Sequence, residues 1–114
     1  MNNLIVKNVN GFSVISMSIK TDITIQNSLM LKKELIEVVE KNQKVLLDLS
    51  ALRFQDTSGI CALVSTLRYA MYLNHSFVLF NLNKQAQELF ELTDVYNIFT
   101  VYKTEEEALD DCTV

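Results

Sequence analysis

The sequence has no proline, two glycines and a single histidine among its 114 residues. Glycine and proline punctuate secondary structure most strongly, so Gly11 and Gly59 each become informative about an element boundary. The histidine, His75, follows a predicted helix, and we expect it to face solvent or to interact with a helix end. No histidine base is therefore expected beside a serine, and a Ser-His-Asp hydrolase is not predicted.

Clustered positive charge and glycine-rich phosphate loops are also missing. The ten lysines and arginines are scattered along a chain of net charge −4, whereas nucleic acid and anionic membranes are bound by concentrated positive charge. The two cysteines, Cys61 and Cys112, lie far apart and form no metal-binding pair. Cys61 falls in an apolar helical pattern and is expected in the core. The sequence predicts no nucleic acid partner, no metal site and no cofactor.

Targeting and membrane-spanning segments are not recognisable either. The N-terminus lacks a basic region followed by an apolar stretch, and no apolar run approaches the roughly 18–20 residues that cross a bilayer. We therefore expect a cytoplasmic protein without membrane insertion. With 49% hydrophobic and 21% charged residues, residues 1–114 are predicted to form one globular domain.

Asn10-Gly11 predicts the tight turn of an opening β-hairpin, because both central residues of a type I′ turn need a positive φ. The register that follows pairs Leu4 with Met17, Val6 with Ile15 and Val9 with Phe12. The first two pairs share one face, which we expect to be the buried face of the hairpin.

Changes in hydrophobic periodicity predict the remaining elements. These are helices at 25–41 and about 57–73, strands at 44–49 and 77–80, a helix capped by Asn83, a strand at 98–102, and a helix opened by Thr104 and Glu107 as a capping box. The order β-β-α-β-α-β-α-β-α predicts an α/β domain with a mixed sheet of about five strands packed against helices.

The helix at 25–41 carries more apolar residues than one buried stripe needs. One helical stripe carries Leu31, Leu35, Val38 and Val39. Asn27 or Ser28 could cap the start of the helix. Leu29 and Ile36 fall outside that stripe, and we expect them to broaden the buried face. In the second helix, the apolar face is predicted to run from Ile60 to Met71.

Asp56-Thr57-Ser58-Gly59 follows a buried strand and opens the second helix. Loops at this place in α/β sheets carry function. The alternative is that one of the three polar residues is simply the helix cap. Three polar residues in a row, however, leave hydroxyls free to face solvent. Gly59 has no side chain beside Ser58, and we expect this to leave room for another group to approach the Ser58 hydroxyl. A phosphoryl group on a hydroxyl here would meet the positive end of the helix.

From Val45 to about Leu92 the sequence resembles the STAS domain of bacterial anti-sigma factor antagonists. The resemblance rests on the strand ending in Asp48-Leu49, on Leu52 and Phe54, on the Asp56–Gly59 turn, on the strand 77–80 and on the segment 86–93. The flanking elements fit the family's order. Members often carry Gly-Glu-Leu-Asp where this chain has Ile19-Lys20-Thr21-Asp22, so Asp22 is the residue retained there.

The resemblance implies partner switching by a protein that is not an enzyme. Family antagonists bind an anti-sigma factor that is also a serine kinase, and that kinase inactivates them by phosphorylating the serine that matches Ser58. A PP2C-type phosphatase removes the phosphate. Thr57 is the second candidate acceptor, and Asp22, Asp56, Thr57, Ser58 and Gly59 are the expected partner-binding residues. The alternative is a phosphorylation-independent STAS adaptor subunit of an ABC-type lipid transporter or other signalling complex.

Overall fold

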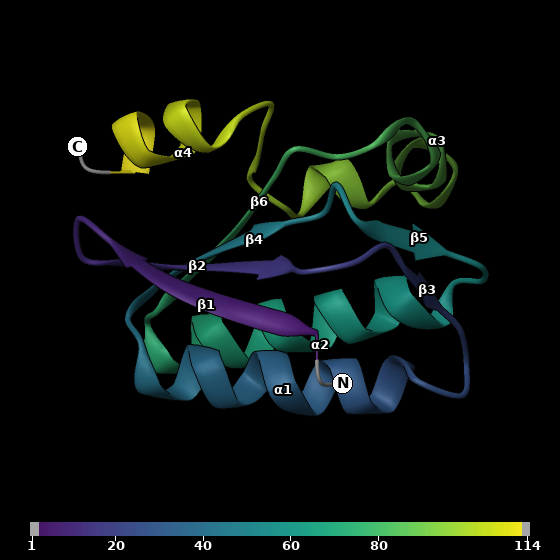
Figure 1. Cartoon of the computed structure of the whole chain (residues 1–114), viewed down its shortest axis with the longest axis horizontal. Helices are drawn as coiled ribbons and strands as arrows, with labels where there is room; N and C mark the ends of the chain where they lie inside the picture. Colours follow the sequence, from purple (N-terminus) through teal and green to yellow (C-terminus); the bar gives the residue numbers. More distant parts are fainter. Residues whose placement is uncertain (1–2, 113–114) are drawn as a thin grey trace.

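The centre of the molecule is a five-stranded mixed sheet with strand order β1-β2-β4-β6-β7 (Figure 1). The structure is a computed structural model that describes residues 3–112. The strands of this sheet are β1 (Leu4–Val9), β2 (Phe12–Met17), β4 (Lys44–Asp48), β6 (Ser76–Phe80) and β7 (Val101–Tyr102). β1 and β2 pair antiparallel and the other neighbours pair in parallel. The predicted α/β class with a mixed sheet of about five strands is confirmed.

Helices cover both faces of this sheet. They are α1 (Ser28–Lys41), α2 (Ser58–Leu73), α3 (Lys84–Thr93) and α4 (Glu105–Cys112), with one 3₁₀ turn, η1 (Val95–Asn97). α1 and α2 pack side by side on one face, and α4 lies on the other (Figure 1). Across residues 3–112, no helix combines the length and the apolar character needed to span a membrane.

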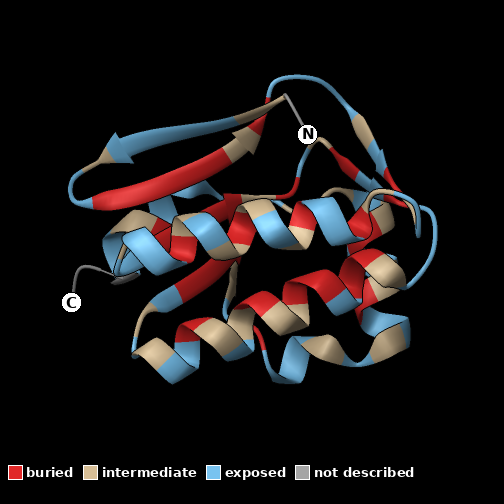
Figure 2. Ribbon diagram, turned by 90° about the horizontal axis from the view of Figure 1, so that it is seen from below, coloured by how far each residue is buried: buried red, intermediate tan, exposed pale blue. Residues whose placement is uncertain are grey.

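The Asn10-Gly11 hairpin has the predicted turn and register. Both turn residues have positive φ, 51° and 85°. The prediction of a single buried face is wrong for β2, because Phe12 and Val14 on its other face are also buried. β1 is the outer strand and stays largely exposed, and its Val6 is 47% exposed (Figure 2). The buried residues of the hairpin therefore belong to the inner strand, β2.

Alternate residues of the central strands contribute to two separate apolar cores. In β4, Val45 and Leu47 join the larger core with α1 and α2, whereas Leu46 points into the smaller one. The smaller core contains Phe12, Val14, Leu46, Val78 and Phe80 and is closed by Ala108 of α4. Coverage of both faces explains why the central strands show little polar–apolar alternation.

Several predictions about helix faces are wrong. The buried face of α1 is narrow, because Leu29 is 72% exposed and Ile36 is only half-buried. Cys61 is exposed and not in the core, since a helix turns about 100° per residue and Leu63 is the residue that faces the sheet. Met71, in the last turn of α2, is exposed as well.

His75 makes a helix-end contact, one of the two outcomes expected for it. Its Nδ1 lies 2.7 Å from the carbonyl oxygen of Val39, in the last turn of α1. Because a carbonyl only accepts, the geometry requires that Nδ1 carry the proton. The imidazole therefore ties the end of α1 to the segment that follows α2.

Candidate functional site

A second, two-stranded sheet positions the loop before α2. It consists of β3 (Thr21–Ile23) and β5 (Leu52–Phe54), which pair in parallel with Asp22 opposite Arg53. The sequence predicts no strand in either segment, because three residues are too few to show a strand period. Gln55 extends the pairing by donating its amide to the carbonyl of Ile23 at 2.9 Å.

The start of α3 holds β5 from its other side. The side chain of Gln85 accepts from the amide of Phe54 at 3.0 Å and donates to its carbonyl at 2.6 Å, as a neighbouring strand would. The Asn83 side chain caps α3 by accepting from Ala86 at 2.8 Å, as predicted. It also donates to the Leu52 carbonyl at 2.8 Å. The segment leading to the site is thus hydrogen-bonded on both edges.

Asp56 binds both the start of α2 and the loop before α1. Its Oδ1 accepts from the amide of Ser58 at 2.9 Å and from the hydroxyl of the same residue. Its Oδ2 accepts from the amide of Ile25 at 3.2 Å. These bonds lower the pKa of the Asp56 carboxyl from its ordinary value of 3.8. The Ser58 hydroxyl is the main cause, followed by the Ser58 amide; desolvation opposes them, and the Ile25 amide makes the smallest contribution.

The three polar residues of the turn have different roles. Asp56 provides the acceptor for a free amide at the helix start, which is the capping function considered from the sequence. Thr57 is the residue at the N-cap position, yet its side chain makes no capping bond and is exposed. Ser58 is the first residue of α2 and is partly exposed, with its hydroxyl proton directed to Asp56. The two candidate acceptor hydroxyls are therefore both at the surface.

Gly59 is required by packing and not by access to Ser58, so that part of the sequence interpretation is wrong. The residue is buried. A Cβ placed on it would lie 2.4 Å from Cδ1 of Phe54 and 2.8 Å from Cγ2 of Ile23. Glycine thus lets α2 approach the β3–β5 sheet closely.

Asp22 lies on the β3–β5 sheet and is connected to the site through the β3–α1 loop. Its carboxylate accepts from Nε of Arg53 at 2.8 Å in an exposed ion pair. Its carbonyl accepts from the side chain of Asn27 at 2.8 Å. Asn27, one of the two candidate caps of α1, makes no capping bond and instead accepts from the amide of Thr24 at 2.9 Å. This loop contains Ile25, whose amide Asp56 binds.

The structure adds residues of α1 to the site that the sequence did not indicate. A groove of about 260 Å³ lies between the starts of α1 and α2. It is lined by Ser28, Leu29 and Lys32 from α1 and by Ser58, Cys61 and Ser65 from α2. The only sequence signal for this arrangement is the position of Leu29 outside the buried stripe of α1.

The chain belongs to the STAS domain family, whose sequence model matches residues 4–108. Its fold is also that of several solved structures. An anti-sigma factor antagonist (STAS) domain protein from Planctomyces limnophilus superposes with a TM-score of 0.84 at 21% identity, covering 97% of this chain and 98% of that one. An anti-sigma factor antagonist from Mycobacterium paratuberculosis gives 0.77 at 22% identity, covering 95% and 91%.

The Bacillus anti-sigma factor antagonist SpoIIAA is similar as well. Its unphosphorylated form has a TM-score of 0.75 at 16% identity, covering 96% of each chain. Its phosphorylated form has a TM-score of 0.67 at 15% identity, covering 96% of this chain and 98% of that one. The same fold occurs in the murine anion transporter Slc26a9, with a TM-score of 0.72 at 17% identity, where the match covers 90% of this chain and only 18% of the transporter. At these identities, the likeness establishes the shared fold.

Proposed function

We propose that this protein is an anti-sigma factor antagonist, a binding protein and not an enzyme, that is switched off by phosphorylation of Ser58. The observation that carries the proposal is the partly exposed Ser58 hydroxyl at the start of α2, hydrogen-bonded to Asp56. The partner is an anti-sigma factor with serine kinase activity, and a PP2C-type phosphatase reverses the modification. The existence of SpoIIAA, a protein of this fold, in a phosphorylated form supports the proposal.

The chemistry of the switch follows from the hydrogen bonds of Asp56. In phosphorylation, a bond forms between Ser58 Oγ and the γ-phosphorus of ATP, the bond from that phosphorus to the β–γ bridging oxygen breaks to release ADP, and the hydroxyl proton is lost to solvent. Ser58 Oγ then has no proton to donate to Asp56. A group carrying about −1.5 to −2 charges stands beside the carboxylate instead. Repulsion between the two weakens the hold of Asp56 on the Ile25 amide, and the surface presented to the partner changes in both charge and shape.

The acceptor is identified by incubation with the kinase and ATP, followed by mass spectrometry of intact protein and peptides. We expect one phosphoryl group on the wild type and on Thr57→Ala, and none on Ser58→Ala. Circular dichroism of each variant serves as the control for folding, since both side chains are at the surface. Phosphate retained by Ser58→Ala and lost by Thr57→Ala would move the switch to Thr57.

Protein purified from cells separates this function from the transporter adaptor. An adaptor binds an ATPase and needs no phosphate cycle. If Ser58 is unmodified in cells while a transporter ATPase co-purifies with the protein, the switch is excluded and the adaptor function takes its place.

A further inference from the structure

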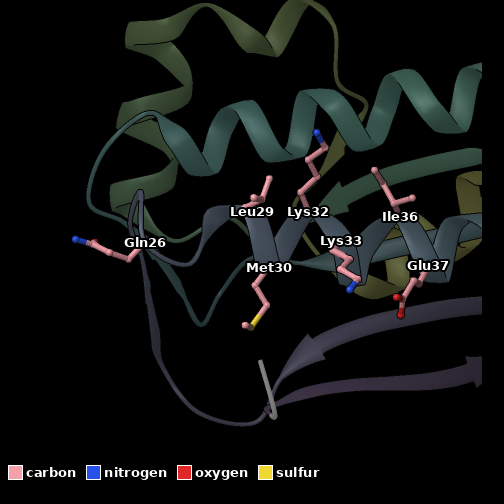
Figure 3. A pocket seen from close by; sticks show the side chains of 7 residues that line it. All are labelled: Gln26, Leu29, Met30, Lys32, Lys33, Ile36 and Glu37. Atoms are coloured by element: carbon pink, nitrogen blue, oxygen red, sulfur yellow. The ribbon is translucent and has the colours of Figure 1, made fainter.

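One side of α1 carries apolar side chains away from the sheet. Leu29 is 72% exposed, and Ile36 follows two helical turns later on the same side. Together with Lys32 and Lys33 they line a surface hollow of about 690 Å³ whose walls are mainly apolar (Figure 3). We call Leu29, Lys32, Lys33 and Ile36 the α1 face. Contiguous apolar surface of this kind marks sites of interaction.

The α1 face is continuous with the groove beside Ser58. Leu29 and Lys32 line both the hollow and the groove, and their side chains extend from α1 toward α2 (Figure 3). A standard protein interface covers about 800 Å² per partner, a patch roughly 30 Å across. The whole molecule measures 34 × 28 × 25 Å. A protein seated over Ser58 is therefore large enough to cover the α1 face as well.

The charge of this surface is opposite to that of the chain. Its hollow is lined by two lysines and by Glu37, a balance of +1 on a protein of net charge −4. Neither Lys32 nor Lys33 has a carboxylate partner among residues 3–112. Both ammonium groups are thus available to a partner, which favours an acidic rim around an apolar contact.

We propose that the α1 face is the docking surface for the anti-sigma factor kinase, which presents an apolar contact rimmed by carboxylates. This rests on the proposed function. It also explains how phosphorylation at Ser58 lowers affinity. Lys32 lines the groove that would contain the phosphoryl group, so the phosphate competes with the partner's carboxylates for the same ammonium group and repels them.

Binding of the purified kinase in the presence of ADP, measured by isothermal titration calorimetry, tests the surface. We expect Leu29→Ser to raise Kd at least tenfold and Lys32→Gln to raise it about threefold to tenfold. The matched controls are Leu92→Ser and Lys84→Gln on α3, which lies well away from α1 (Figure 1). Leu92 is 83% exposed, and both controls should stay within twofold of the wild type.

A second measurement tests the role of Lys32. Phosphorylation of Ser58 should raise Kd by a smaller factor in Lys32→Gln than in the wild type, because the competition for Lys32 is gone. If phosphorylation raises Kd by the same factor in both proteins, Lys32 does not mediate the effect of the phosphate.

The docking surface and the proposed function fail in different ways. If the kinase phosphorylates Ser58 but Leu29→Ser and Lys32→Gln bind it like the wild type, the docking surface is wrong and the function stands. If the kinase leaves Ser58 unmodified, the function fails and the docking proposal falls with it. Light scattering that shows a dimer disrupted by Leu29→Ser, with kinase binding unchanged, would assign the α1 face to a second copy and overturn the proposal.

Discussion

Asp56 joins the start of α2 to the loop before α1 through a single side chain. One carboxylate oxygen binds the amide and hydroxyl of Ser58, and the other binds the amide of Ile25. A carboxylate that accepts several hydrogen bonds is stabilised in its charged form. At this scale, therefore, the ionisation of Asp56 and the state of the Ser58 hydroxyl are coupled.

This coupling predicts a pH-dependent contribution to stability. Because the pKa of Asp56 is lowered in the folded protein from 3.8, its stabilisation is present above that value and is lost as pH falls through the folded pKa. Asp56→Asn removes the charge and should lower Tm at pH 7, with the difference from the wild type shrinking below pH 3.8. Thermal unfolding followed by circular dichroism from pH 7 to pH 3 measures this.

The matched control for this titration is Asp94→Asn. Asp94 is an exposed residue with φ of 59°, a conformation that asparagine also tolerates. Comparison with Asp56→Asn separates the loss of the Asp56 hydrogen bonds from the general effect of exchanging an exposed carboxylate for an amide. A pH-independent difference for Asp56→Asn would show that the carboxylate contributes no charge-dependent stability.

At the scale of elements, the orientation of α2 depends on its contact with the small β3–β5 sheet. Gly59 is the point of closest approach, against Phe54 and Ile23. The sheet in turn is held by Gln85 of α3. Ser58 is therefore positioned by packing between elements that lie far apart in the sequence, and the turn alone does not determine its orientation.

Gly59→Ala should destabilise the protein by about 1 kcal/mol in urea unfolding. Alanine gains at most about 1 kcal/mol in helix propensity, but overpacking of a buried contact costs about 1–3 kcal/mol. The buried ring of Phe54 has little room to move away. In a Phe54→Leu background, the same substitution should be less destabilising, since the ring atoms are removed and only the contact with Ile23 at 2.8 Å remains. Equal destabilisation in both backgrounds would mean that the Phe54 contact is not the cause.

At the scale of the whole molecule, two cores on opposite faces of one sheet share the same strands. The larger core holds α1 and α2, which carry the candidate site, and the smaller core is closed by α4. Leu46 and Leu47 are neighbours in β4 but belong to different cores. A substitution that destabilises the packing of one core is therefore expected to destabilise the other through the shared strand.

Ala108→Asp tests the contribution of α4. Ala108 is fully buried against the smaller core. A carboxylate at this position would lie in apolar surroundings, where burial of a charge without a hydrogen-bonding partner is costly. We expect a loss of about 3 kcal/mol of unfolding free energy, with α4 detaching first in hydrogen exchange. Glu106→Asp, an exposed change in the same helix, should cost under about 0.5 kcal/mol. A near-neutral Ala108→Asp would show that α4 does not stabilise the sheet.

Local features of the sequence were sufficient for much of the fold. The Asn10-Gly11 turn, the capping by Asn83 and the apolar runs of β4 and β6 each depend on residues close together in the chain, and all were predicted. The STAS family was also indicated by a contiguous pattern, and the family match confirms it. Short-range patterns reveal such features because the physical interactions behind them are themselves short-range.

The Asp56–Gly59 turn shows what only the tertiary structure decided. The sequence by itself determined that hydroxyl groups follow a buried strand at a helix start, and it indicated Ser58 and Thr57 as candidate acceptors. The bond from Ile25 to Asp56, the contact of Gly59 with Ile23, and the groove shared with Leu29 and Lys32 required the fold. These contacts join residues about thirty positions apart or lie on helix faces that periodicity leaves ambiguous, so no local pattern in a single sequence encodes them.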